Sequence, residues 1–156
     1  MHLSSLIKKE LVLLELKAQN KEEVIREMAE LISKDKRIKD KDRLIQAMFE
    51  REELGTTGIG NGLAIPHART DAVKDIVIAF AKSKEGADFE SMDKKPANLF
   101  FMVVGPQEKN KEYLRVMSIL ARLFSKEENR QTLMRATTPK EIIKSVAKME
   151  EEENLG

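Results

Sequence analysis

A glycine-rich segment that leads to a proline–histidine pair is the part of the chain best suited to chemistry. Four of the seven glycines lie between positions 55 and 62, and the only interior histidine, His67, follows five residues later. Glycine allows positive φ and close approach to another group. Histidine can take up and give up a group near neutral pH. The spacing predicts that His67 carries the function, with its ring presented at a wall of backbone.

Other chemistries find less support in the sequence. A Walker loop is absent, and the glycines do not complete Gly-x-Gly-x-x-Gly because position 63 is leucine. No metal site is expected, because His67 has no histidine or cysteine near it. A Ser-His-Asp triad stays open as an alternative, although no nucleophile-elbow motif is present. The favoured interpretation is that His67 is itself the nucleophile, with neither metal nor cofactor.

The composition is typical of one domain with a well-solvated surface. The chain has 156 residues, of which 41% are hydrophobic and 35% charged, and its formal net charge is +1. This balance provides no field that would favour nucleic acid or an anionic membrane. Without cysteine there is no disulfide framework and no cysteine nucleophile. No signal peptide or membrane-spanning run is recognised, so we expect a cytoplasmic protein without direct membrane insertion and without a nucleic-acid partner.

Alternating strands and helices are expected to position the site. Apolar runs predict strands at residues 11–16, 63–65, 75–83 and 99–104, the second one stopped by Pro66. Capping signals predict helices that start at Asn20, at Asp40 or Asp42, at Asn110, at Ser125 and at Thr138. The helix from Asn110 is apolar on most faces and is expected to be buried.

These elements predict an α/β fold, a three-layer domain with a mixed β-sheet flanked by helices on both faces. The connection between residues 83 and 99 resembles a long hairpin, so at least one pair of strands is expected to be antiparallel. We expect a single domain over residues 1–149, followed by an acidic and frayed tail at residues 150–156.

The residues around His67 resemble the signature of a known family. Glu52, Ile59-Gly60 and the run 63–68 (Leu-Ala-Ile-Pro-His-Ala) are similar to the active-site pattern of the enzyme IIA domains of the phosphoenolpyruvate-dependent sugar phosphotransferase system. The branch is the fructose/mannitol/nitrogen-regulatory (type 2) one, and the resemblance covers nearly the whole chain. It implies a single domain of the enzyme IIA type 2 kind and a phosphotransferase activity.

Three functions stay open within this resemblance. In the first, His67 accepts a phosphoryl group from the phosphocarrier protein HPr and passes it to an enzyme IIB on a separate chain, which serves a sugar transporter. In the second, the protein is a nitrogen-type regulator whose phosphorylation state controls binding to a regulatory target protein. In the third, it is a degenerate module that binds a partner without phosphorylation. The intact histidine, arginine and glycine loop argue against the third.

The resemblance also implies roles for single residues. His67 is the catalytic nucleophile, and Arg51 resembles the family arginine beside it, whose guanidinium can hold phosphate oxygens with two hydrogen bonds. Phosphoryl transfer needs donors around the equatorial oxygens. We expect these donors to be backbone amides of the glycine loop, arranged as a nest, and two threonine hydroxyls. The predicted phosphate-binding residues are Thr56, Thr57, Gly58, Gly60 and Gly62.

One position departs from the family pattern. Many relatives carry a second histidine near the start of the helix after the central strand, where this chain has Tyr113. A tyrosine hydroxyl can donate to phosphate, but it is no cation at neutral pH. Tyr113 is therefore predicted to lie beside His67 as a neutral donor. Arg69 is interpreted as a surface charge rather than a phosphate ligand.

Overall fold

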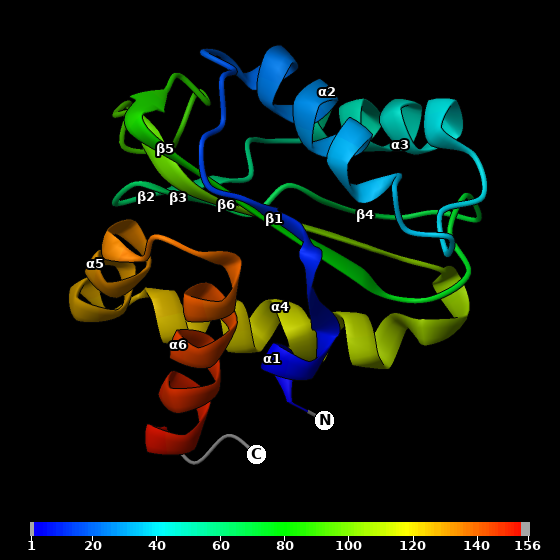
Figure 1. Cartoon of the computed structure of the whole chain (residues 1–156). Helices are drawn as coiled ribbons and strands as arrows, with labels where there is room; N and C mark the ends of the chain where they lie inside the picture. Colours follow the sequence, from blue (N-terminus) through cyan, green and yellow to red (C-terminus); the bar gives the residue numbers. More distant parts are fainter. Residues whose placement is uncertain (1, 154–156) are drawn as a thin grey trace.

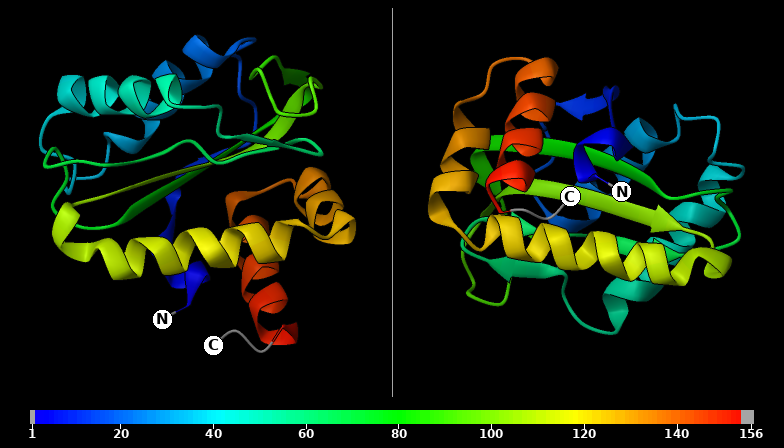
Figure 2. Two further views of the ribbon diagram at one scale, coloured as in Figure 1. Left: turned by 180° about the vertical axis from the view of Figure 1, so that it is seen from behind. Right: turned by 90° about the horizontal axis from the view of Figure 1, so that it is seen from below.

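The computed structural model describes residues 2–153, which fold into three layers (Figure 1). The middle layer is a six-stranded sheet. One face is covered by α2 (Lys21–Ile32) and α3 (Lys41–Glu53). The other face is covered by the elements seen together from below in Figure 2, which are α1 (Leu3–Leu6), α4 (Asn110–Phe124), α5 (Glu127–Arg135) and α6 (Pro139–Glu152). The predicted three-layer α/β fold is confirmed.

The sheet is mixed, with β6 (Ala97–Gly105) at its centre. β5 (Val77–Ala87) pairs antiparallel with β6, as the long connection between them predicts, and β1 (Ile7–Leu13) pairs parallel with β5. On its other side β6 pairs parallel with β3 (Leu63–Ala64) and with β4 (His67–Arg69). β2 (Gly58–Gly60) completes the sheet as the antiparallel partner of β3.

The chain passes from β3 to β4 without a change of register on β6. Leu63 lies opposite Leu99 and His67 lies opposite Val103, the same offset on both sides of Pro66. Pro66 has no amide hydrogen to give, but its carbonyl accepts a hydrogen bond from the Val103 amide at 3.0 Å. The strand therefore stops at the proline, as predicted, and resumes directly as β4, which the sequence did not predict. His67 thus begins a short strand that the central strand holds in place.

Alternation along the central strands divides the buried side chains between two cores. One core, with α2 and α3, contains Val77, Ala79, Ala81, Phe100, Met102 and Val104. The other, with α4, α5 and α6, contains Ile76, Ile78, Phe80, Leu99, Phe101 and Val103. Because both faces are buried over residues 77–81 of β5 and 99–104 of β6, these stretches are apolar without a polar alternate. The two packed cores, one on each face, hold the sheet at a fixed place between the helical layers.

Three predicted helix starts are confirmed. The side chains of Asn20, Asp40 and Thr138 each accept a hydrogen bond from the backbone amide three residues later, which caps α2, α3 and α6. Within residues 2–153, no helix has the length and apolar character needed to cross a membrane.

The other two predicted starts are wrong by a residue or two. A 3₁₀ turn at Gln107–Lys109 leads into α4, so the cap position is Lys109 and Asn110 is already helical. The cap position of α5 is Lys126 and not Ser125. The Ser125 hydroxyl donates to the carbonyl of Arg122 at the end of α4, and so does not cap α5. α4 is also amphipathic rather than apolar on most faces, with a single buried stripe.

Residues 150–152 of the expected frayed tail are the last turn of α6, and residues 154–156 lie outside the described residues. Glu150 lies within α6 and is 1% exposed. Its carboxylate accepts the backbone amides of Leu3 at 2.5 Å and Ser4 at 2.8 Å. Amides in the first turn of a helix have no partner inside the helix, so a buried acceptor there is stabilising. The last helix therefore fixes α1, and the ordered domain extends past residue 149.

Replacing Glu150 with alanine should lower the free energy of unfolding by about 1.5–3 kcal/mol, because two buried amides lose a charged acceptor. Urea denaturation followed by circular dichroism measures this. Glu151→Ala, at the exposed neighbouring position, is the matched control and should change stability by less than about 0.5 kcal/mol. Equal stability of the two variants would contradict the capping role.

Candidate active site

His67 lies at the sheet edge where the two helical layers meet. Ala68 belongs to the core under α2 and α3, so the side chains of His67 and Arg69 point to the opposite face, toward α4. His67 is half-buried and borders a cavity of about 360 Å³. The other lining residues are Ala47, Glu50, Arg51, Leu54, Ala68, Arg69, Gln107, Tyr113 and Leu114. The cavity is therefore built from α3, β4 and the start of α4.

One hydrogen bond defines the protonation of the His67 ring. Nδ1 lies 2.6 Å from the carbonyl oxygen of Ile65. Because a carbonyl only accepts, Nδ1 must carry the proton and Nε2 keeps its lone pair when the ring is neutral. The histidine is thus held as the tautomer whose free nitrogen is Nε2.

The surroundings of His67 favour the neutral ring. Burial lowers the pKa of His67 below its ordinary 6.5, and the hydrogen bond to Ile65 opposes this. The positive charges of Arg51 and Arg69 lower the pKa further, while the negative charge of Glu52 raises it. With a pKa below 6.5 the imidazole is neutral at pH 7, so its Nε2 lone pair is available as a nucleophile.

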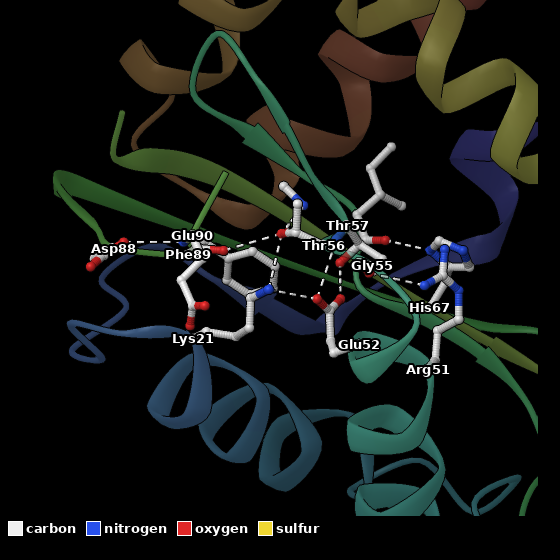
Figure 3. Close-up of polar contacts among 12 residues, drawn as sticks. Lys21, Arg51, Glu52, Gly55, Thr56, Thr57, His67, Asp88, Phe89 and Glu90 are labelled. Carbon is white, nitrogen blue, oxygen red and sulfur yellow. Dashed lines mark hydrogen bonds and ion pairs between the residues drawn. The ribbon is translucent and has the colours of Figure 1, made fainter. Parts of the chain in front are cut away.

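Arg51 is positioned by the end of α3, as predicted. It lies in the last turn, and its guanidinium donates to the carbonyl of Gly55 at 3.1 Å (Figure 3). Gly55 follows the end of the helix with φ at +150°. This contact uses one of the five guanidinium N–H groups, which leaves the others for a ligand in the cavity that Arg51 and His67 share.

Arg69, which the sequence analysis interprets as a surface charge, is exposed and also lines the cavity at His67. Its guanidinium lies 5.7 Å from the centre of the Tyr113 ring and donates to the side chain of Asn110. A cation over an aromatic face is attracted to it, so the exposed arginine is held beside the cavity. The available signal was the two-residue spacing from His67, which places both side chains on one face of a strand. Without a predicted strand at 67–69, that signal could not be used.

Tyr113 lies next to His67, as the resemblance to the family predicts. The two ring centres are 6.2 Å apart, and Tyr113 is 4% exposed. Burial raises the pKa of Tyr113 to about 12 despite the opposing charges of Arg69 and Arg51. The phenol is therefore a neutral donor at physiological pH. Among the described residues, no hydrogen bond joins it to His67.

The glycines of the segment have a visible role in the β2–β3 hairpin. Gly60 and Gly62 have φ of +111° and +81°, in the region that favours glycine. A Cβ on Gly58 would lie 2.5 Å from the hydroxyl oxygen of Ser91. None of the three is among the residues that line the cavity at His67. Their positive φ and close approach serve the hairpin and its packing, and their role as a phosphate nest stays a prediction.

The two threonines also lie outside the cavity lining. The Thr56 hydroxyl oxygen lies 3.0 Å from Lys21 Nζ and 3.3 Å from the Phe89 carbonyl, and it accepts the Gly58 amide. The Thr57 hydroxyl donates to Glu52. Both side chains therefore anchor the loop. Within residues 2–153, no group of three His, Cys, Asp or Glu side chains is placed to hold a metal ion.

The lowered pKa of His67 has a direct test. NMR titration of the ring should give a midpoint below 6.5, and both Arg51→Ala and Arg69→Ala should raise it, because each removes a positive charge that disfavours imidazolium. Arg122→Ala, which removes an exposed charge on α4 outside the cavity, is the matched control and should leave the His67 midpoint unchanged. A His67 midpoint that neither variant moves would remove the arginines from its surroundings.

Comparison with known proteins gives the family. The family model described as phosphoenolpyruvate-dependent sugar phosphotransferase system, EIIA 2, matches residues 5–149. The fructose-specific EIIA component of Haloferax volcanii is 39% identical over 140 residues, which cover 90% of this chain and 91% of that protein. The fructose-specific EIIABC component of Bacillus subtilis is 38% identical over 143 residues, which cover 92% of this chain but only 22% of that longer protein.

Solved structures agree with this relationship. The nitrogen regulatory protein IIA-Ntr of Neisseria meningitidis superposes with a TM-score of 0.85 at 29% identity, covering 92% of this chain and 97% of the other. Enzyme IIA-mannitol of Escherichia coli, solved in complex with phosphorylated enzyme IIB-mannitol, gives a TM-score of 0.78 at 27% identity, with 92% and 99% covered. The chain therefore belongs to the EIIA type 2 family of the phosphoenolpyruvate-dependent sugar phosphotransferase system.

Proposed function

We propose that this protein is a cytoplasmic phosphohistidine carrier, with Nε2 of His67 as the atom that takes the phosphoryl group. The donor is phospho-HPr, and the acceptor is an enzyme IIB of a fructose/mannitol-type transporter. The observation that carries the proposal is the Nδ1–H bond to the Ile65 carbonyl, since it leaves Nε2 free in a cavity bordered by two arginines. The fructose-specific relatives and the mannitol IIA–IIB complex support this choice of partner.

The proposed transfer is a displacement at phosphorus. The Nε2 lone pair forms the new N–P bond while the bond between phosphorus and the HPr donor atom breaks, and the HPr atom leaves with its electron pair. Nδ1 keeps its proton throughout, so the phosphorylated ring stays bonded to Ile65 and carries a positive charge that the phosphoryl oxygens offset. In the second transfer, the IIB nucleophile attacks the same phosphorus and the electron pair returns to Nε2. No water and no metal enter this balance.

In this proposal, the two arginines offset the negative charge of the phosphoryl oxygens. Arg51 and Arg69 border the cavity with His67, one from α3 and one from β4. Guanidinium groups remain charged at all relevant pH values and donate in a planar fork that fits phosphate. Tyr113 adds a neutral hydroxyl donor. The threonines and glycines of the 56–62 segment support this arrangement by holding the loop.

A regulatory output is the second candidate function. The likeness to the Neisseria meningitidis nitrogen regulatory protein supports it. It uses the same phosphorylated His67 but ends in binding to a target protein instead of transfer to enzyme IIB. Mixing the phosphorylated protein with a purified fructose-type IIB separates the two: transfer of the label supports the carrier, and a stable phosphoprotein supports the regulator.

The carrier residue is tested by incubation with phosphoenolpyruvate, enzyme I and HPr, followed by intact mass measurement. The wild-type protein should gain one acid-labile phosphoryl group, and His67→Ala should gain none because the nucleophile is missing. His2→Ala is the matched control and should be phosphorylated like the wild type. Uptake of phosphate by His67→Ala would contradict the proposal that His67 is the carrier residue.

The arginines are tested by the rate of phosphorylation. Arg69→Ala and Arg51→Ala should each slow transfer roughly ten- to a hundredfold, since a charge-assisted hydrogen bond is worth about 1.5–3 kcal/mol. The lysine variants should recover only part of the rate, because an ammonium lacks the fork. Arg122→Ala, on the exposed side of α4, is the control. If Arg69→Ala matched this control, Arg69 would have no part in phosphate binding.

A further inference from the structure

A buried carboxylate that the transfer chemistry does not use lies next to the His67 segment. Glu52 follows Arg51 in α3, and its side chain is only 5% exposed. Three donors surround it: the Thr57 amide at 3.2 Å, the Thr57 hydroxyl, and Lys21 Nζ at 2.8 Å (Figure 3). A buried carboxylate needs such partners, because removing it from water is otherwise costly.

Lys21 joins this group from α2, the helix that packs beside α3. It is the first residue of α2, and its side chain is 14% exposed. Besides the ion pair with Glu52, its ammonium bonds the Thr56 hydroxyl at 3.0 Å and lies 5.0 Å from the centre of the Phe89 ring. One lysine therefore ties α2, the end of α3 and the loop at residues 56–57 together.

The loop that this group holds is bonded to the segment that orients His67. The carbonyl of Thr57 accepts the amide of Ile65 at 3.0 Å. The carbonyl of the same Ile65 accepts Nδ1–H of His67 at 2.6 Å. An unbroken series of contacts thus leads from Lys21 through Glu52, Thr57 and Ile65 to the catalytic ring.

We propose that Lys21, Glu52 and Thr57 are positioning residues for phosphoryl transfer, which fix the Ile65 carbonyl and through it the tautomer and direction of the His67 ring. The inference rests on the proposed role of His67 as carrier. None of the three residues lines the cavity, so they act through the backbone and not on the phosphate. In-line transfer tolerates little misplacement of the nucleophile, and a shift of about 1 Å can cost a hundredfold in rate.

The positioning role differs from a purely stabilising one in what it predicts for the ring. A structural ion pair would affect the free energy of unfolding alone. A positioning unit also influences which nitrogen of His67 carries the proton, because the Ile65 carbonyl favours the tautomer protonated on Nδ1. The tautomer of neutral His67 is therefore the decisive observable, and ¹⁵N-labelled histidine makes it visible in the free protein.

Thr57→Val, Thr57→Ser and Lys21→Met test the inference in the full chain. Valine has nearly the shape of threonine but deprives Glu52 of the hydroxyl, whereas serine retains it. We expect Thr57→Val and Lys21→Met to lower the Nδ1–H fraction of His67 and to slow transfer from phospho-HPr on the order of tenfold. The loss should fall on kcat rather than on KM, and Thr57→Ser should keep wild-type behaviour.

Glu150→Ala provides the control for lost stability, since it also removes the partner of buried amides but lies in α6, away from β4. It should lower stability without changing the tautomer or the rate. If Thr57→Val and Lys21→Met behaved like Glu150→Ala, with wild-type tautomer and rate, the positioning role would be overturned.

The two proposals fail in different ways. If wild-type protein takes no phosphate from phospho-HPr, the carrier function fails, and the NMR measurement on unphosphorylated protein still decides the positioning role. A tautomer that shifts in Thr57→Val but not in Thr57→Ser supports positioning, and an unchanged tautomer overturns it.

Discussion

The hydrogen bond between His67 Nδ1 and the Ile65 carbonyl is the contact on which the rest of the site depends. It selects the tautomer, so it decides which nitrogen is free to react. Its acceptor is a backbone atom only two residues away, and that atom stays in place because both flanks are fixed. Pro66 restricts the chain between them and bonds Val103 in the central strand. On the other flank the Ile65 amide is held by Thr57.

The positive charges of Arg51 and Arg69 have two effects at the His67 ring. Arg51 and Arg69 make imidazolium unfavourable and so keep the ring neutral. The same two cations offset the negative charge that a phosphoryl group brings. In the proposed transfer, one pair of side chains therefore serves both the neutral acceptor and the phosphorylated product. Tyr113, with its raised pKa, adds no charge that changes between these states, so both arginines act at any physiological pH.

Local signals in the sequence account for much of this, and contacts between distant segments account for what it missed. Asn20, Asp40 and Thr138 cap their helices because capping depends on a few adjacent residues. Lys21 reaches Glu52 only after two helices pack on the sheet, which no local pattern encodes. The glycines were recognised as special, but positive φ serves a hairpin as well as a phosphate nest. β4 was not predicted, since a three-residue strand after proline lacks a period to detect, and the position of Arg69 beside the cavity was therefore not predicted either.

The position of β4 explains how one histidine can be both rigid and accessible. Among the described residues, the backbone of His67 pairs with Val103 alone. The His67 side chain borders the cavity. A residue at positions 77–81 of β5 or 99–104 of β6 would be equally rigid, but both faces of these stretches are buried and no protein partner could reach it. A residue in a free loop would be reachable, but its nucleophile would not be aimed. An exposed edge normally invites unwanted strand pairing, and β4 limits this by being three residues long and directly preceded by proline. The proposed carrier meets two different proteins at one nitrogen atom and needs this combination, which the edge of a well-packed sheet supplies.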